Sequence, residues 1–397
     1  MKAQVALLLT ALHFSYAVPT GQTILSPVHD SINRGRLVFE NKLASLPHSW
    51  PGIELDLNQR RLVQFEDSEP VWITELEKIY AKASGAKFFD ITDTQPSTAF
   101  HTVDSKPYPK PNCSDTVQEV ISYLSTKGPK SNLATFTSFR TRYYRSDTGK
   151  QSQEWLLGRI YEITSAASTR DDIDIAEFAH SWGQNSIIAK IPGTNPSGSI
   201  IISAHQDSIN TWPFFPAPGA DDDGSGTVTI LEAYRVLLEA GFKPKNDIEF
   251  HWYSAEEGGL LGSQAVATDY RQNKAKVLAQ IQFDMTAFVK KGTREEVGVI
   301  TDYVDPNVVK FVQQLIKAYL SIPYVETKCG YACSDHASWS KNGYPSSFAI
   351  ESSFENSNHD IHSTRDTMDL PEFSFEHMLE FSKLAVAFAI ELADYKP

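Results

Sequence analysis

Three short apolar segments of the chain each lead directly into acidic residues or a histidine. Each is rich in β-branched or aromatic residues and too short for a typical helix, which predicts a buried strand. The segments and the polar residues that follow them are Ser199–Ala204 with His205, Asp247–Ser254 with Glu256 and Glu257, and Leu278–Phe283 with Asp284. Any fold for this chain must therefore place three polar strand ends around a largely apolar interior.

Helical patterns alternate with these and further predicted strands. Helices are expected at Gly226–Ala240, Val308–Leu320 and Phe375–Tyr395, and additional strands at Ser186–Ile191, Val297–Thr301 and Ser347–Ile350. Such alternation favours an α/β three-layer sandwich, with a mostly parallel central sheet flanked by helices. Ligands of such sheets bind beyond the carboxyl ends of the strands. The polar strand ends are therefore predicted to form the functional site.

The segment Pro218–Gly226 adds three consecutive aspartates, Asp221 to Asp223, just before a predicted helix. Because adjacent like charges repel, the segment favours a bound divalent cation. The alternative is a solvated acidic turn that caps the helix. Together with the polar strand ends, these acids suit a pair of zinc ions that share a carboxylate and a water. The pattern alone leaves open which aspartate points inward.

The chain has eleven histidines, of which a few are candidate ligands. His205 ends a strand, and Asp207 is close enough in sequence to orient its imidazole. His251 lies within a predicted strand and is expected to pack in the core. The spacing of the other candidates does not decide between them; they are His336, His359 and His362.

The adjacent acids Glu256 and Glu257 are followed by two glycines, which allow close approach of the backbone. One glutamate would bind metal while the other stays free as a general base. The alternative is that both are simply the charged start of a helix.

Length and charge narrow the class of protein. The 397 residues, 41% of them hydrophobic, suffice for one large domain plus an accessory segment. The net charge of −13 argues against nucleic-acid binding and against binding to anionic membranes. No apolar run reaches the length of about 18 residues that a membrane span needs.

The N-terminus reads as a signal peptide over residues 1–17. It has Lys2, an apolar stretch from Val5 to Leu12, and small residues at the cleavage positions Ser15 and Ala17. We therefore expect a secreted protein. Residues 18–87 carry no cluster of ligands and are predicted to be a removable pro-segment, with 88–397 as the catalytic domain; the alternative is an integral N-terminal subdomain. Within the pro-segment, a strand is expected at Arg60–Phe65 and a helix at Val71–Ala83.

The three cysteines fit an oxidising compartment. Cys329 and Cys333 are four residues apart, which suits a small disulfide loop, although a pair of reduced core thiols is the alternative. Cys113 has no evident partner. It lies in the only N-x-S/T sequon, so Asn112 is a candidate glycosylation site.

From about Phe88 to the end, the chain resembles the secreted two-zinc leucine aminopeptidases, of bacterial and especially fungal type. Six blocks in the same order carry the resemblance. They are His205-Gln206-Asp207-Ser208, Pro218–Gly226, Ala255–Ser263, Asp284-Met285-Thr286, Cys329–His336 and Ile361-His362-Ser363.

The resemblance implies a zinc-exopeptidase type of fold and a role for each matching residue. Asp222 would bridge two zinc ions, His205 and Asp284 would complete one site, and Glu257 and His362 the other. Glu256 would be the general base, Asp207 would orient His205, and Tyr331 would hydrogen-bond the substrate carbonyl or its oxyanion. His251, His336 and His359 are not ligands in this pattern.

These roles predict an extracellular, monomeric metallo-aminopeptidase that acts on peptides and prefers apolar N-terminal residues such as leucine. Two other enzymes remain as alternatives, a single-zinc glutaminyl cyclase and a carboxypeptidase-type relative. A third alternative is a non-catalytic binding domain that has lost its metals.

Overall fold

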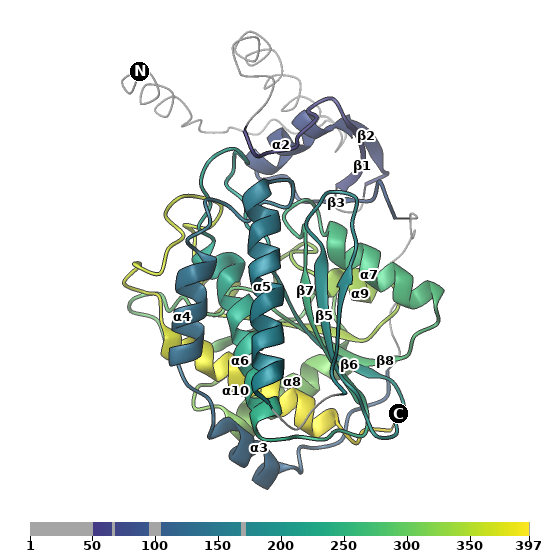
Figure 1. Cartoon of the computed structure of the whole chain (residues 1–397), viewed down its shortest axis with the longest axis vertical. Helices are drawn as coiled ribbons and strands as arrows, with labels where there is room; N and C mark the ends of the chain where they lie inside the picture. Colours follow the sequence, from purple (N-terminus) through teal and green to yellow (C-terminus); the bar gives the residue numbers. More distant parts are fainter. Residues whose placement is uncertain (1–50, 66–67, 95–104, 168–171, 397) are drawn as a thin grey trace, which may run out of the picture. The chain divides into compact units, whose positions relative to one another are not determined.

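The computed structural model in Figure 1 describes residues 51–65, 68–94, 105–167 and 172–396. The predicted signal peptide and residues 18–50 of the predicted pro-segment lie outside these ranges. Among the described residues, no helix combines the length and apolar character that a membrane crossing requires.

An eight-stranded sheet with the order β10-β9-β11-β8-β6-β7-β5-β4 forms the centre of the fold. Its strands are β4 (Asp174–Phe178), β5 (Ser186–Ile191), β6 (Ser199–His205), β7 (Asp247–Tyr253), β8 (Val277–Phe283), β9 (Val297–Ile300), β10 (Tyr324–Thr327) and β11 (Ser346–Ile350). The central strands β11, β8, β6 and β7 run parallel, while β5 and β4 continue the sheet antiparallel. The expected mostly parallel sheet is confirmed.

Helices cover both faces of this sheet (Figure 1). The helices are α3 (Ser114–Ile121), α4 (Lys127–Phe136), α5 (Asp147–Ala166), α6 (Gly226–Glu239), α7 (Leu261–Gln272), α8 (Pro306–Tyr319), α9 (His336–Lys341) and α10 (Phe375–Leu392). Ile200 and Ile202 of β6 pack in one core cluster with residues of α3, α5, α6, α8 and α10. The intervening Ile201 packs in another cluster with residues of α7 and α9. Alternate side chains of a strand point to opposite faces, so the three-layer sandwich follows.

The N-terminal part that is described forms a small antiparallel sheet with one helix. Its strands are β1 (Arg60–Phe65), β2 (Val71–Thr74) and β3 (Phe88–Asp90), in the order β2-β1-β3, and its helix is α2 (Glu75–Ala83). The predicted strand at 60–65 is confirmed.

The predicted helix over 71–83 begins four residues late. Thr74 caps α2 by accepting the N–H of Glu77, whose carboxylate in turn accepts the N–H of Thr74. The residues before this capping box are extended and pair with β1. The apolar residues at 71–73 thus belong to a strand, and the capping box marks the true start of the helix.

The predicted boundary at 87/88 falls between α2 and β3. Asp90 in β3 is buried and accepts from Arg61 Nε at 2.7 Å and Lys78 Nζ at 2.9 Å. The predicted pro-segment is therefore tied to the residues that follow it by buried ion pairs as well as by strand pairing.

Candidate metal centre

The predicted ligands come together beyond the carboxyl ends of three neighbouring parallel strands. His205 is the last residue of β6, Asp284 directly follows β8, and Glu257 lies shortly after β7. Asp222 belongs to the segment η2 (Ala220–Ser225) that precedes α6, where its own backbone is not helical, and His362 belongs to the loop after β11. The prediction that polar strand ends share one edge of the sheet is confirmed.

Asp222 faces a histidine with each of its carboxylate oxygens. His205 Nε2 lies 3.2 Å from Asp222 Oδ1 and 3.6 Å from Asp284 Oδ1. His362 Nε2 lies 3.0 Å from Asp222 Oδ2 and 3.1 Å from Glu257 Oε2. This is the arrangement that a carboxylate shared by two metal ions needs.

These separations suit zinc. With Zn–N and Zn–O distances of about 2.0–2.2 Å, two ligand atoms of a tetrahedral ion lie about 3.4 Å apart. The four distances above fall between 3.0 and 3.6 Å. Moreover, His205 Nε2 and Asp284 Oδ1 are buried and have no hydrogen-bond partner among the described residues. The donor set therefore fits a bound cation.

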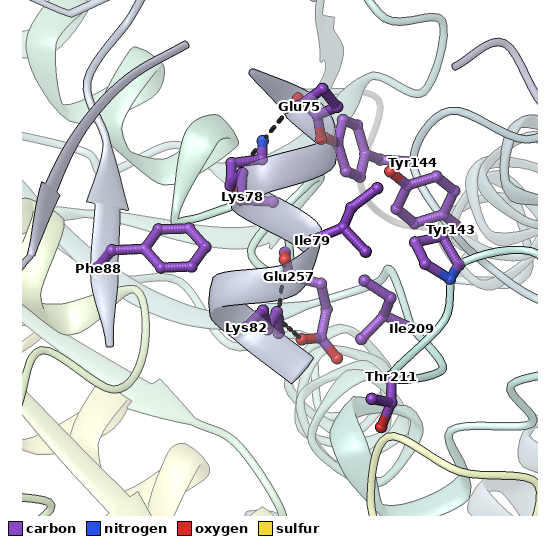
Figure 2. Close-up of a pocket in the computed structure, with 12 residues that line it drawn as sticks. Glu75, Lys78, Ile79, Lys82, Phe88, Tyr143, Tyr144, Ile209, Thr211 and Glu257 are labelled. Carbon is purple, nitrogen blue, oxygen red and sulfur yellow. Dashed lines mark hydrogen bonds and ion pairs between the residues drawn. The ribbon is translucent and has the colours of Figure 1, made fainter. Parts of the chain in front are cut away.

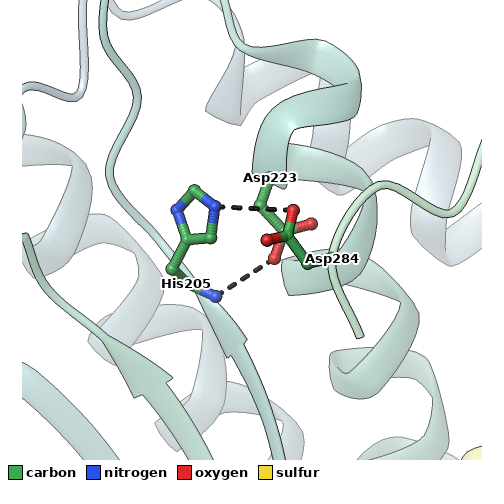
Figure 3. Close-up of side chains that lie close together, drawn as sticks. All are labelled: His205, Asp223 and Asp284. Atoms are coloured by element: carbon green, nitrogen blue, oxygen red, sulfur yellow. Dashed lines mark hydrogen bonds and ion pairs between the residues drawn. The ribbon is translucent and has the colours of Figure 1, made fainter. Parts of the chain in front are cut away.

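The three consecutive aspartates have three different surroundings. Asp223 accepts the backbone N–H groups of His205, Gly226 and Met285 at 2.8–3.1 Å, so its oxygens are already engaged although they lie near His205 and Asp284 (Figure 3). Asp221 accepts from Ala287 N–H, Ser225 Oγ and Asn358 Nδ2. Asp222 alone presents both oxygens to histidines, which resolves the choice that the sequence left open.

The carboxylates around His205 and His362 favour a positive charge at both histidines. Burial alone would lower the pKa of His362, but Glu257 and Asp222 raise it to about 9. Burial also lowers the pKa of His205, yet Asp284, Asp207 and Asp222 together raise it well above its usual value. A divalent ion at each histidine would supply this charge and leave both imidazoles neutral.

Asp207 holds both adjacent glutamates by their backbone. Its Oδ1 accepts the N–H of Glu256 at 3.0 Å and its Oδ2 that of Glu257 at 3.1 Å, while Oδ1 also lies 3.4 Å from His205 Nδ1. Asp207 thus lies beside His205, but His205 Nδ1 has no hydrogen-bond partner among the described residues, so the role of Asp207 in orienting this imidazole stays a prediction. Sequence reasoning missed the link to the glutamates, since nothing in the local pattern signals it.

The two glutamates differ in their contacts. Glu257 is buried and lies in the ligand group with Asp222 and His362. Glu256 lies neither in this group nor in the one around His205. Burial raises the pKa of Glu256 well above its usual value, and Glu257 raises it further. A free carboxylate with a high proton affinity beside a metal site suits a general base.

Tyr331 lies on a disulfide-closed loop at the same site. Cys329 and Cys333 are bonded with their Cα atoms 6.1 Å apart, which confirms the predicted bridge. Burial raises the pKa of Tyr331, and the charges of Glu256 and Asp284 raise it further, because its hydroxyl lies near the carboxylates. Its role toward substrate remains a prediction.

The other candidate residues lie apart from the ligand groups. His251 bonds to Glu249 and Tyr253 inside the sheet, and the ring of His336 packs 5.0 Å from that of Phe348. His359 contacts the carbonyl of Glu355. Cys113 is a free thiol, as expected, and Asn112 is exposed, so its glycosylation stays a prediction.

Lysines of the N-terminal part reach the site, which sequence reasoning missed. Lys82 of α2 donates to Glu257 Oε2 at 2.5 Å and to the Glu257 carbonyl at 2.8 Å (Figure 2). Lys78, one turn earlier, donates to the carbonyl of Gly258 at 3.3 Å. Lys87 donates to the Tyr331 hydroxyl at 3.2 Å, with its ammonium 4.2 Å from the ring centre.

Helix α2 and residues of the loops opposite it line a small pocket beside these contacts (Figure 2). Its lining includes Ile79 and Lys82 from α2, and Tyr143, Ile209 and Glu257 from the opposite wall. The helix thus covers a hollow that opens onto a predicted metal ligand.

A mostly parallel sheet with two histidines and three carboxylates beyond the carboxyl ends of its strands is typical of a metallo-exopeptidase. Residues 186–386 match the model of peptidase family M28, and the chain belongs to this family. Leucine aminopeptidase 1 of Neurospora crassa is 50% identical over 347 residues, which cover 83% of this chain and 85% of that protein.

Further comparisons agree. Leucine aminopeptidase 1 of Trichoderma harzianum is 47% identical over 375 residues, covering 90% of this chain and 92% of that protein. The crystal structure of the LapA aminopeptidase of Legionella pneumophila matches with a TM-score of 0.75 and 29% identity, over 85% of this chain and 99% of that one. The chain is accordingly a zinc aminopeptidase, a hydrolase of peptide bonds.

Proposed function

We propose that this chain is a secreted aminopeptidase that uses two zinc ions to remove apolar residues, leucine among them, from the N-termini of peptides. The observation that carries the proposal is the position of Asp222, whose two oxygens face His205 and His362 at 3.2 and 3.0 Å. Asp284 and Glu257 complete the two ligand groups. When bound, the zinc ions would supply an activated water and polarise the substrate carbonyl.

The chain's own residues have separate tasks in this reaction. Glu256 takes the proton of the attacking water and returns it to the leaving amine. Tyr331 donates a hydrogen bond to the carbonyl oxygen as negative charge develops on it. Asp207 keeps Glu256 and Glu257 in place through their backbone N–H groups. The predicted ligand Glu257 thus stays in place while Glu256 takes up and gives back the proton.

Exopeptidase action requires that the free α-amine of the substrate be recognised. The ammonium of Lys82 bonds to the carboxylate and the carbonyl of Glu257, which supports this position as one that accepts an amine cation. We infer that, once Lys82 has left and a metal ion holds Glu257 Oε2, the substrate amine binds beside this ion at the Glu257 carbonyl. A peptide without a charged N-terminus would lose this interaction.

The preference for apolar residues is supported by the surroundings of the Tyr331 loop. A cluster of buried apolar side chains adjoins the disulfide; it consists of Met285, Ile300, Phe348 and Ile350. The half-buried Phe354 and Ile361 pack against the same cluster. We infer that an apolar substrate side chain rests against these two half-buried residues, where contact with carbon removes it from water and favours leucine over charged residues.

Product analysis tests the activity. We expect release of free leucine from leucyl peptides and from leucine amide, and no cleavage after acetylation of the N-terminus. Removal of the C-terminal residue would point to a carboxypeptidase, and cyclisation of an N-terminal glutamine to a glutaminyl cyclase. Absence of any turnover by the zinc-loaded mature chain would favour a binding domain. Each of these results would contradict the proposal.

We also propose that residues 18–87 form a pro-segment that blocks the site until it is removed after secretion. Lys82 and Lys87 support this, because they contact the predicted ligand Glu257 and the predicted oxyanion donor Tyr331. N-terminal sequencing of secreted active enzyme should give a start near residues 84–89. An active form that begins near Val18 would refute removal as a requirement.

A further inference from the structure

Arg142, in the loop between α4 and α5, is a fully buried residue with 0% exposure. Its guanidinium donates to three backbone carbonyls. Nε donates to the carbonyl of Gln206 at 2.9 Å, Nη2 to that of Gly219 at 2.8 Å, and Nη1 to that of Pro218. The face of the guanidinium lies 4.2 Å from the ring centre of Phe136.

These carbonyls belong to the two segments that carry His205 and Asp222. Gln206 directly follows His205, while Pro218 and Gly219 come just before the aspartate segment. The backbone reinforces the link, since the N–H of Arg142 donates to Ser208 Oγ at 3.0 Å, and this hydroxyl donates to the carbonyl of Ala217 at 2.8 Å. One side chain therefore ties both segments together.

Burying the charge of Arg142 costs free energy that a purely structural residue need not spend. Taking a cation out of water costs several kcal/mol, and apolar residues of similar volume often stabilise a protein equally well. Burial lowers the pKa of Arg142 to about 10, which still leaves it charged at neutral pH. Asp366, Asp207 and Asp223 act on it from a distance, so its charge also offsets part of the acidic cluster.

Local geometry is adapted to the guanidinium. A Cβ atom at Gly219 would lie 2.8 Å from Arg142 Nη2 and 2.5 Å from Ser208 Cβ, and Gly219 has a φ of +53°. Only glycine leaves room for the clamp at this point. Arginine offers donors in several directions of one plane, whereas the single ammonium of lysine cannot reach the three carbonyls in the same geometry.

We propose that Arg142 is a positioning residue of the metal centre, which holds His205 and Asp222 at the spacing that one ion needs. It touches neither substrate nor metal and acts through the backbone on either side of the ligands. This inference rests on the proposed two-zinc site.

The test measures the affinity of the metal-free full-length protein for zinc alone, by competition with a chelator. We compare the wild type with Arg142→Lys, which keeps the charge, and Arg142→Met, which removes it. Loss of a group that orients ligands typically lowers metal affinity about 10- to 100-fold. We expect a loss of this size for Arg142→Met and a smaller one for Arg142→Lys.

Arg235→Lys is the matched control. Arg235 of α6 donates to Glu232 at 2.6 Å and to the carbonyl of Tyr123 at 2.7 Å, and neither residue carries a predicted ligand. It should keep the zinc affinity of the wild type even where its thermal stability falls. In the mature protein without residues 18–87, both Arg142 variants at saturating zinc should retain KM while kcat is reduced.

Equal zinc affinity in the wild type and both folded Arg142 variants would overturn the proposal, as would an equal loss in Arg235→Lys. If Arg142→Met does not fold, Arg142→Lys against Arg235→Lys decides in the same way. Failure of the wild type itself to bind zinc would instead refute the proposed metal site, so the two failures are distinguishable.

Discussion

Lys82 should compete with a metal ion for Glu257. In the full-length chain its ammonium lies 2.5 Å from Glu257 Oε2, while His362 Nε2 lies 3.1 Å from the same oxygen. The pair is well shielded, with exposures of 24% for the lysine side chain and 2% for the glutamate side chain. An ion that takes this oxygen must first displace the ammonium. We therefore predict that Lys82→Met strengthens zinc binding to the full-length chain.

The size of the effect follows from the bond that zinc must break. A hydrogen bond to a charged group contributes about 1.5–3 kcal/mol. At about 1.4 kcal/mol per factor of ten, the zinc affinity of the Asp222–Glu257–His362 group should rise roughly 10- to 150-fold. The affinity of the His205 group should stay unchanged. Calorimetric titration of the metal-free protein with zinc resolves the two steps.

Lys87→Met is the control for this experiment. Lys87 contacts the Tyr331 hydroxyl and ring, neither of which is a predicted ligand, so its loss should leave both zinc affinities unchanged. A chain that lacks residues 18–87 should bind zinc as tightly as Lys82→Met does. The reasoning is refuted if Lys82→Met binds zinc no more tightly than the wild type, or if Lys87→Met gains as much.

Three other outcomes are expected. Glu256→Gln should keep its zinc and its KM but lose about 10²–10⁴-fold in kcat, because it lacks the base. Glu257→Gln should lose zinc first, and its activity should partly return at high zinc concentration. Equal zinc loss in both variants would contradict their separate roles. Reduction of the Cys329–Cys333 bridge should impair activity more than global stability, as judged by kcat beside the thermal midpoint, because so short a loop constrains little of the unfolded chain. Burial raises the pKa of Glu249, but its hydrogen bonds to neighbouring side chains lower this pKa to about 2 overall. The stability that Glu249 contributes is therefore present above about pH 4.5 and should be lost as the pH falls toward 2. Glu249→Gln should flatten this part of a pH-dependent unfolding profile.

The sheet and its functional edge were predictable because their signals are local. The composition of segments such as Ser199–Ala204 predicts a buried strand. The residue that follows such a segment lies at the carboxyl end of the strand, where the functional site is expected. The same reasoning failed at residues 71–74. There the apolar pattern continued from strand into helix, and the capping pair Thr74 and Glu77 was the signal that marks the boundary.

The finer arrangement of the site depends on contacts between distant parts of the chain. Which of the three aspartates faces the histidines is decided by the backbone N–H groups of His205 in β6 and of Met285 just after β8, which bind Asp223. Lys82 and Glu257 are separated by 175 residues, and Arg142 and Gly219 by 77. No local spacing predicts such pairs, because they exist only once the sheet has brought its loops together.

Zinc content measured beside activity tests the two-metal site most directly. Metal-free mature protein is titrated with zinc, and leucine amide hydrolysis is followed at each point together with the bound zinc per chain. The position of Asp222 between His205 and His362 predicts two zinc ions per chain, with full activity reached only as the second binds. Full activity at one zinc per chain, without further gain, would contradict it.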